Sequence, residues 1–324
     1  MAHRARSVVL VNGSLREMGK SGCILFCLAM LAAVLIAGPV IWIATAPAKP
    51  FQTDDPRLSA LGDAERGRLL FAAGDCASCH ARPGEGNRLL LGGGMALASP
   101  FGTFRPPNIS TDPVDGIGTW TPADLATALI KGVSPDGRHY YPAFPYTSYT
   151  GMTFEDIRDL YAYLRTLPAV SGKAPPHDLP FLFRIRRMLG AWKRLFFRER
   201  QTAAVFTGDP LHDRGAYLVS SVAHCAECHS SRNIFGAIRE KTRFAGGVDP
   251  EGTGFIPNIT PDRIGHWSQD DIARMLETGA TPDHGRVGSS MADVVVNTRM
   301  LTADDRRAIA AYIASLPARP TPHP

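Results

Sequence analysis

The stretches CASCH (76–80) and CAECH (225–229) decide how this chain of 324 residues is organised. Each has two cysteines separated by two residues and followed at once by a histidine. Sliding the chain against itself by about 150 residues brings one stretch onto the other, together with a series of further features. A chance pair of motifs would not have matching surroundings, so the chain is predicted to contain two copies of one domain.

The matching features keep the same order in both copies. They are PNIS with PNIT (107–110 and 257–260), GTW with GHW (118–120 and 265–267), and the closing segments that begin at Met152 and at Leu301. We expect one domain at 57–170 and the other at 208–318, with a linker at 171–207 and an N-terminal segment at 1–48.

Each copy has the pattern of a small all-helical domain. The expected helices contain Gly67 or Gly215, begin at Thr121 or Ser268, and begin again at Thr153 or Thr302. The last four positions are Ser or Thr caps followed three residues later by Asp, which is typical of a helix start. The two glycines would let the first and last helices cross closely, because glycine has no side chain at the contact. The alternative is that each glycine is a tolerated helix defect.

The two cysteine motifs carry the chemistry. Two thiols three positions apart can each add to a vinyl group of one porphyrin, and the adjacent histidine then lies beneath the iron as an axial ligand. The predicted covalent attachment points are Cys76 and Cys79 with axial His80, and Cys225 and Cys228 with axial His229. The competing interpretation is a structural zinc site in which both cysteine pairs meet. Because each pair has its own histidine and its own repeat, we expect two covalently bound haem c groups.

The sixth iron ligand is expected from the loop before each closing helix. In the second copy Met291 is well placed, whereas Met300 adjoins the helix start, where a packing residue is expected. In the first copy Met152 is the candidate, although its place before the cap at Thr153 also suits a hydrophobic staple. His139 as the ligand, or a five-coordinate iron, remain alternatives.

The N-terminal segment has the pattern of a membrane anchor. Ile24 to Ala46 is a nearly unbroken apolar run. Of the six cysteines, four belong to the two motifs and the other two, Cys23 and Cys27, lie in this apolar N-terminal stretch, so a disulfide framework is not expected. Roughly 20 helical residues cross the hydrocarbon layer, so the run is long enough to span it. Its basic flank is N-terminal, which places that end in the cytoplasm and both domains outside. A cleaved signal peptide ending at Ala44-Thr45-Ala46 is the alternative, but the run is longer than the usual apolar core of such a peptide.

The positive charge is confined to two segments. Residues 1–50 carry +4 and residues 180–200 carry +6, so the rest of a chain with a net charge of +5 is near −5. Nucleic-acid binding is therefore not expected.

The linker contains an amphipathic stretch, FLFRIRRMLGAWKRLFFRER (181–200). At helical spacing, one face is apolar and basic residues surround it. The apolar face consists of Ile185, Met188, Leu189, Trp192 and Phe196. Three interpretations are open: a helix on the membrane surface, a docking site for a partner protein, or a helix that packs between the domains with its charges solvated.

The order of motifs resembles that of the cytochrome c subunits of bacterial membrane-bound dehydrogenases. After CASCH come GGG (92–94), FGTFRPPNIST (101–111), GIGTW (116–120), DGRHYYPAFPY (136–146) and AYLRTLP (162–168). The resemblance covers both domains and includes subunits of alcohol and gluconate dehydrogenases and the dihaem cytochromes that accompany molybdenum-containing hydroxylases. It implies two tandem cytochrome c domains after the N-terminal helix. In those relatives a methionine that ligates iron stands where this chain has Phe144.

The resemblance also implies a role. The chain is expected to be an electron-transfer subunit rather than an enzyme, anchored by a single helix in a bacterial inner membrane with its haem domains in the periplasm. Its donor would be the catalytic subunit of a dehydrogenase, and its acceptor quinone, another cytochrome or a terminal oxidase. The alternative is a dihaem peroxidase-like enzyme with an open site at the first haem, because Phe144 replaces a ligand there. A haem sensor is not indicated, since no signalling domain is recognisable.

Overall fold

The computed structural model describes residues 20–199, 207–252 and 254–322. They fall into two units, of which the first ends at Ala46 and the second begins at Pro47.

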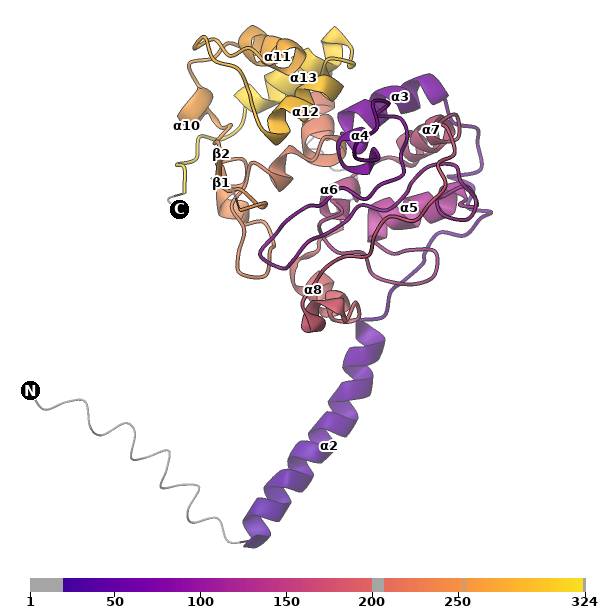
Figure 1. The fold of residues 1–324 in the computed structure, drawn as a ribbon. Coiled ribbons are helices and arrows are strands. Elements are labelled where there is room, and N and C mark those ends of the chain that lie inside the picture. The colour runs from indigo at the N-terminus through magenta and orange to yellow at the C-terminus, as the bar shows by residue number, and fades with distance from the viewer. Residues whose placement is uncertain (1–19, 200–206, 253, 323–324) are drawn as a thin grey trace, which may run out of the picture. The chain divides into compact units, whose positions relative to one another are not determined.

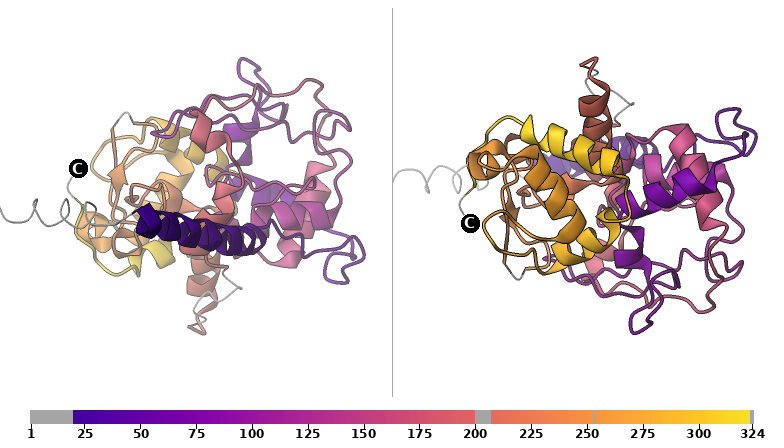
Figure 2. Two further views of the ribbon diagram at one scale, coloured as in Figure 1. Left: turned by 90° about the horizontal axis from the view of Figure 1, so that it is seen from below. Right: turned by 90° about the horizontal axis from the view of Figure 1, so that it is seen from above.

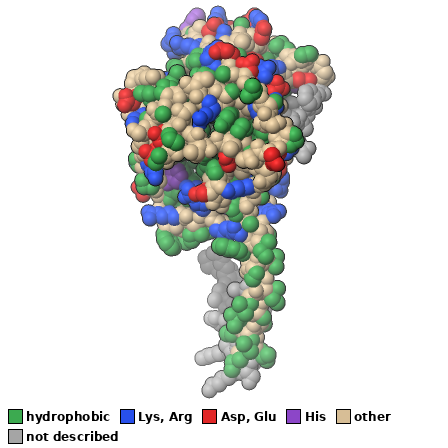
Figure 3. All heavy atoms as spheres, turned by 90° about the vertical axis from the view of Figure 1, so that its right-hand side faces the viewer, with side chains coloured by type: hydrophobic (Ala, Val, Ile, Leu, Met, Phe, Trp, Pro, Cys, Tyr) green, Lys and Arg blue, Asp and Glu red, His purple; other side chains and the backbone are tan. Residues whose placement is uncertain are grey.

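The first unit contains helix α2 (Lys20–Ala44). Within it, Ile24–Ala44 has a mean hydropathy of 2.8 over 21 residues, a length of roughly 30 Å at about 1.5 Å per residue. The apolar side chains described along it, from Ile24 to Ile43, are exposed, and Figure 3 shows hydrophobic groups along it. Among the described residues, α2 alone is both long and apolar enough to cross a bilayer. The predicted basic flank, with Arg4, Arg6 and Arg16, lies outside the described residues.

The second unit contains both repeats and the linker (Figure 1). The first repeat consists of α3 (Ala64–Ala73), α4 (Cys76–His80), α5 (Pro122–Lys131), α6 (Tyr146–Tyr149) and α7 (Phe154–Leu164). The linker has a 3-10 turn, η1 (Phe181–Arg184), and helix α8 (Met188–Phe196). The second repeat consists of α9 (Pro210–Tyr217), η2 (Leu218–Val222), η3 (Cys225–Glu227), η4 (Glu240–Thr242), β1 (Gly247–Val248), β2 (Phe255–Ile256), α10 (Pro261–Ile264), α11 (Gln269–Thr278), α12 (Ser290–Thr298) and α13 (Ala303–Ala314). Strands β1 and β2 are only two residues each and form one antiparallel pair, whereas the other described elements are helical. The predicted all-helical class is therefore confirmed.

The predicted helix starts are present. Thr121 and Ser268 each form a complete capping box, in which the cap side chain and the aspartate three residues later exchange hydrogen bonds with each other's backbone N–H. Thr153 and Thr302 accept a hydrogen bond from the backbone N–H three residues later. Short polar side chains therefore satisfy N–H groups that the first helical turn leaves unpaired.

The first and last helices of each repeat cross at the predicted glycine. A Cβ atom added to Gly67 would lie 1.9 Å from the carbonyl oxygen of Asp159 in α7. One added to Gly215 would lie 1.9 Å from the carbonyl oxygen of Ala308 in α13. Only hydrogen fits at either crossing, which confirms the packing interpretation over a tolerated defect.

Helices α6 and α12 occupy positions that the sequence indicated only as loops. The run Val294-Val295-Val296 in α12 is β-branched, which lowers the intrinsic preference for a helix. Val295 is buried and α12 packs against α11 and α3. Tertiary packing thus stabilises a helix that local propensity does not indicate.

The linker helix is shorter than the amphipathic stretch and packs against the second repeat. The Trp192 indole N–H donates to the carbonyl oxygen of Phe235 at 2.9 Å, and the Phe196 and Phe235 ring centroids are 5.6 Å apart. These contacts support the third interpretation for Trp192 and Phe196, a helix that packs between the domains. Met188, by contrast, is 56% exposed.

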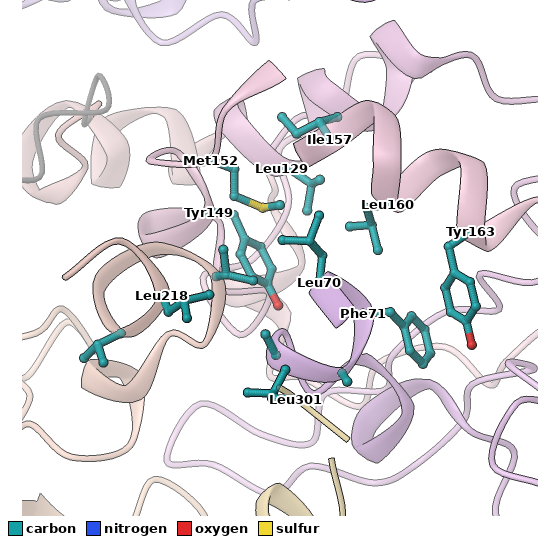
Figure 4. Close-up of a cluster of buried hydrophobic side chains, with 14 of the residues drawn as sticks. Leu70, Phe71, Leu129, Tyr149, Met152, Ile157, Leu160, Tyr163, Leu218 and Leu301 are labelled. Atoms are coloured by element: carbon teal, nitrogen blue, oxygen red, sulfur yellow. The ribbon is translucent and has the colours of Figure 1, made fainter. Parts of the chain in front are cut away.

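One hydrophobic core runs through both repeats. In Figure 4, Tyr149 and Met152 of the first repeat lie beside Leu218 of the second, and Leu301 lies close by. The two views of Figure 2 show the two repeats side by side. The pair therefore forms one folded unit rather than two independent domains.

Candidate haem-binding sites

The first cysteine motif forms the short helix α4, and the residue before it, Asp75, adopts a left-handed conformation with φ 52°. The chain therefore turns between the end of α3, capped by Gly74, and the start of α4 at Cys76. The His80 ring nitrogen Nδ1 lies 2.9 Å from the carbonyl oxygen of Pro107. The ring is therefore fixed through Nδ1, while its other nitrogen, Nε2, is left to face a partner.

The second motif repeats this arrangement. His224 precedes it in a left-handed conformation with φ 41°, and η3 begins at Cys225. The His229 Nδ1 lies 2.8 Å from the carbonyl oxygen of Pro257. Pro107 and Pro257 both begin the PNI motif that the repeat alignment brought into register.

The asparagine of each PNI motif holds that carbonyl in place. Asn108 is buried, and its side-chain amide donates to the carbonyl oxygen of Val170 at 2.6 Å while its oxygen accepts from the N–H of Ser110. Asn258 is also buried, and it donates to the carbonyl oxygen of Arg319 at 2.8 Å. Each motif is therefore tied to the segment that follows the closing helix.

A glycine after each motif allows the PNI segment to approach. The carbonyl oxygen of His80 accepts from Gly93 N–H at 2.8 Å, and that of His229 accepts from Gly246 N–H at 2.9 Å. Gly93 has φ 67° and Gly246 has φ 82°. A Cβ on either would meet a backbone oxygen within 2.5 Å, so both positions require glycine.

The electrostatics keep both imidazoles neutral. Burial lowers the pKa of His80 and of His229, and the carbonyl partners only partly oppose this. A neutral imidazole whose Nδ1–H donates to a carbonyl has an unprotonated Nε2, which is the tautomer that ligates a metal. Burial also raises the pKa of Cys76 and Cys225 to about 12, so these thiols are uncharged at neutral pH.

The zinc interpretation finds no support in the geometry. Within the part of the chain that the structure describes, no three His, Cys, Asp or Glu side chains gather closely enough to hold a metal ion. The two cysteine pairs therefore do not form the shared four-ligand site that zinc would require.

The proposed sixth ligands lie in different surroundings. Met291 is half-buried in the first turn of α12 rather than in a loop, and it packs against the hydrophobic core. Met300 is 42% exposed, so the expectation that it packs was wrong. Met152 is 5% exposed and precedes the cap of α7, as its repeat equivalent Leu301 precedes that of α13. The equal burial of Met152 and Leu301 favours a packing role for both.

The other two residues singled out in the first repeat are held by aromatic and backbone contacts. Phe144 is half-buried, with its ring centroid 5.5 Å from that of Tyr140 and 5.7 Å from that of Tyr149. His139 is buried, and its carbonyl oxygen accepts from Arg186 at 2.9 Å.

Comparison with known proteins agrees with this geometry. The family model described as cytochrome c matches residues 64–168, the first repeat. The chain is 51% identical over 297 residues to a protein of Cereibacter sphaeroides named diheme cytochrome c-type, covering 89% of this chain and 97% of that relative. The chain belongs to the dihaem c-type cytochromes. It carries out electron transfer, the activity of this family, and binds haem c.

Other relatives of this cytochrome are longer proteins. It is 36% identical to the fructose dehydrogenase cytochrome subunit of Gluconobacter japonicus, covering 90% of the cytochrome and 59% of the relative. It is also 36% identical to the cytochrome c subunit of the quinone-dependent alcohol dehydrogenase of Gluconacetobacter polyoxogenes, covering 79% of the cytochrome and 56% of that relative. The cytochrome thus spans less than two thirds of the length of these dehydrogenase cytochrome subunits.

The donor set of the cytochrome fits haem c. Each motif presents two neutral thiols and one imidazole fixed through Nδ1, which are the groups that attach a porphyrin and ligate its iron. When bound, the haem supplies an iron that changes oxidation state by one electron. Sequence reasoning found these groups but not the carbonyls of Pro107 and Pro257. The repeated PNI motif was the signal that could have indicated them.

Proposed function

We propose that this protein is a membrane-anchored dihaem cytochrome with one covalent haem in each repeat. It takes electrons from a dehydrogenase catalytic subunit in the periplasm of a bacterium and passes them to quinone, another cytochrome or a terminal oxidase of the respiratory chain. The observation that carries the proposal is the second occurrence of the complete site, from the cysteine pair to the imidazole bonded to a proline carbonyl.

The residues have separate roles in this proposal. Cys76, Cys79, Cys225 and Cys228 hold the haems, and His80 and His229 are the axial ligands. Met291 is the sixth ligand of the second haem iron. Met152 is the candidate for the first, against the packing role that its burial favours.

The dehydrogenase partner is inferred from the relatives. Cytochrome subunits of fructose, alcohol and gluconate dehydrogenases are 34 to 36% identical to this chain. Helix α2 supports an anchor because its length and hydropathy suit a bilayer. A single-pass helix with a cytoplasmic N-terminus puts both repeats in the periplasm.

Haem content tests the number of sites. The full chain should contain two haems. The double variant Cys76→Ser/Cys79→Ser and its match Cys225→Ser/Cys228→Ser should each retain one covalent haem, measured as haemochrome per protein. A wild-type value of one haem would refute the dihaem proposal.

Substrate-dependent reduction tests the relay. Alcohols, sugars and sugar acids are added in turn to membranes that contain the tagged cytochrome, and its visible spectrum is followed. One substrate class should reduce both haems, and a dehydrogenase should co-purify with the tag. No reduction by any substrate, in membranes whose dehydrogenases are active, would contradict the role.

An enzymatic role is the second candidate, favoured by the aromatic packing of Phe144 at the position where the family resemblance implies a ligating methionine. It requires an open coordination position at the first haem. Carbon monoxide binding to the reduced protein, together with peroxidase turnover, would support it. Absence of carbon monoxide binding at both haems would exclude it.

A further inference from the structure

Each cysteine motif touches the other repeat through the second of its two intervening residues. In the first motif this residue is Ser78, whose Oγ accepts a hydrogen bond from the Asn297 side-chain amide of α12 at 3.0 Å. In the second motif it is Glu227, whose Oε1 accepts one from the Ser148 hydroxyl of α6 at 3.1 Å. In the register that aligns the cysteine pairs, Ser148 corresponds to Asn297. The same contact is therefore made twice, once in each direction.

Further bonds reinforce the contact at Ser78. The Asn297 amide also donates to the carboxylate of Asp75, which accepts from the Ser78 hydroxyl at 2.6 Å. On the rim of this contact, Arg88 lies 3.8 Å from Asp293 of α12. Asn297 is 4% exposed, so its bonds are made out of water, where losing them is costly.

The contact at Glu227 is reinforced in the same way. The Thr147 hydroxyl donates to Glu227 Oε1 at 2.6 Å, and Arg232 donates to Oε2 at 2.8 Å. Glu227 is 8% exposed, and both of its carboxylate oxygens accept hydrogen bonds. The carboxylate therefore ties α6 to the second motif.

Between these two contacts, Tyr149 meets the start of both motifs. Its hydroxyl donates to the carbonyl oxygen of Gly74 at 3.2 Å, two residues before Cys76. Its ring centroid lies 5.5 Å from that of His224, the residue before Cys225. His224 Nε2 itself lies 3.2 Å from the Gly74 oxygen. The two haem-binding segments are therefore in direct contact.

The surrounding helices also make contacts between the repeats in both directions. Helix α12 of the second repeat packs on α3 of the first, and α6 of the first packs on η2 of the second (Figure 1). Because α3 and η2 lead into the two cysteine motifs, each repeat supports the approach to the other repeat's haem site.

We propose that Asn297, Thr147 and Ser148 are positioning residues that fix the spacing between the two haem attachment edges, so that an electron passes directly between the haems of one chain. This rests on the proposed presence of two haems. One iron loses one electron and the other gains it, so no further reactant is needed. Electron tunnelling falls steeply with edge-to-edge distance, and contacts between the attachment segments keep that distance short.

The test uses the full-length holoprotein in detergent, with a flash-activated reductant supplying less than one electron per chain. Redistribution of the electron between the haems is followed in the visible spectrum, and both midpoint potentials are measured by redox titration. In wild type the redistribution rate should be independent of protein concentration. Asn297→Asp places a second carboxylate against Asp75 and should slow it at least tenfold.

A second variant and a matched control separate spacing from stability. Thr147→Val/Ser148→Ala removes both hydroxyl donors to Glu227 at nearly constant volume and should also slow the redistribution at least tenfold. Thr298→Val removes a buried bond to the Leu276 carbonyl from the same helix but within the second repeat, and should leave the rate within twofold. Both midpoint potentials should stay unchanged in the control.

Three results would overturn the proposal. The first is that both interface variants redistribute the electron as fast as Thr298→Val. The second is a wild-type rate that rises with protein concentration, and the third is an interface variant whose thermal stability falls while its redistribution rate stays at the wild-type value. Haem content is measured first. Fewer than two haems per chain would refute the proposed function, whereas two haems with unaltered exchange would refute only the positioning role. The reductant replaces the dehydrogenase, so failure to find a partner does not affect this test.

Discussion

The two histidines proposed as axial ligands show how single residues can be set for ligation. His80 and His229 each engage a proline carbonyl through Nδ1, and burial keeps both rings neutral. A buried carbonyl that fixes ring orientation is a typical outer partner of a metal-bound histidine. Single backbone groups, held by Asn108 and Asn258, thus determine which nitrogen faces the iron site.

Gly67, at the crossing of α3 and α7, is predicted to be essential for stability. Gly67→Ala would place a Cβ atom 1.9 Å from the Asp159 oxygen. We expect a loss of more than about 3 kcal/mol, or no stable protein, because two backbones would have to separate. Thermal unfolding of the purified holoprotein measures this. Gly86→Ala, where an added Cβ meets nothing within 4 Å, is the control, and equal melting temperatures for both variants would contradict the crossing role.

His177 is expected to make stability depend on pH. It accepts a hydrogen bond from the Arg105 N–H through Nδ1 at 3.0 Å and contacts the rings of Phe104 and Tyr141. Burial, with a smaller effect from the positive charge of Arg186, lowers its pKa to about 4. The unfolded chain takes up this proton near pH 6.5, so the free energy of unfolding should fall as the pH drops from about 6.5 to about 4.

The variant His177→Gln keeps an acceptor but does not titrate. Its melting temperature should change less than that of wild type between pH 7 and pH 4.5. The same substitution at exposed His266 is the control and should retain the full wild-type change. A pH dependence of His177→Gln as steep as that of wild type would show that another group is responsible.

At the scale of elements, a helix end of the first repeat is capped by the linker. The Lys193 Nζ of α8 donates to the carbonyl oxygens of Lys131 and Gly132 at 2.6 and 2.8 Å, at the end of α5. It also lies 4.6 Å from the centroid of the Tyr146 ring. A side-chain donor at a helix C-terminus satisfies carbonyl groups that have no partner within the helix.

Lys193→Met should therefore destabilise the protein. We expect a loss of about 1–3 kcal/mol, because two carbonyl groups at the end of α5 lose their hydrogen-bond donor while the side-chain volume is nearly kept. The melting temperature of the holoprotein reports it. Lys173→Met, at an exposed lysine earlier in the linker, should change the melting temperature little. The role of Lys193 as a cap is refuted if both variants melt together.

At the scale of the whole molecule, the two repeats share one core, whereas α2 belongs to a separate unit. The folded unit should therefore not depend on the N-terminal helix for its stability. Loss of the helix should change where the protein is found rather than whether it folds.

Replacing residues 1–46 by a cleavable signal peptide tests this separation. The shortened protein should appear in the soluble periplasmic fraction with both haems, because it lacks the apolar segment long enough to span a bilayer. Haem stain after cell fractionation measures the distribution, and the full chain is the control. Retention in the membrane that only detergent releases would show that another segment anchors the protein.

The sequence by itself determined the helical class and the helix caps, and it predicts the duplication and the haem-attachment residues. These depend on short-range spacing, such as two thiols and a histidine within five positions or an aspartate three residues after Thr121. The close helix crossings at Gly67 and Gly215 could be predicted because the two glycines occupy equivalent places in both copies.

Only the tertiary structure decided which groups meet across the chain. The carbonyls of Pro107 and Pro257, the helical state of Met291, the packing of Trp192 on Phe235 and the reciprocal contacts of Ser78 and Glu227 all join distant segments. Backbone carbonyls have the same chemistry at every residue, and a β-branched run can be helix or loop. Which of them acts depends on packing between elements, which local spacing does not encode.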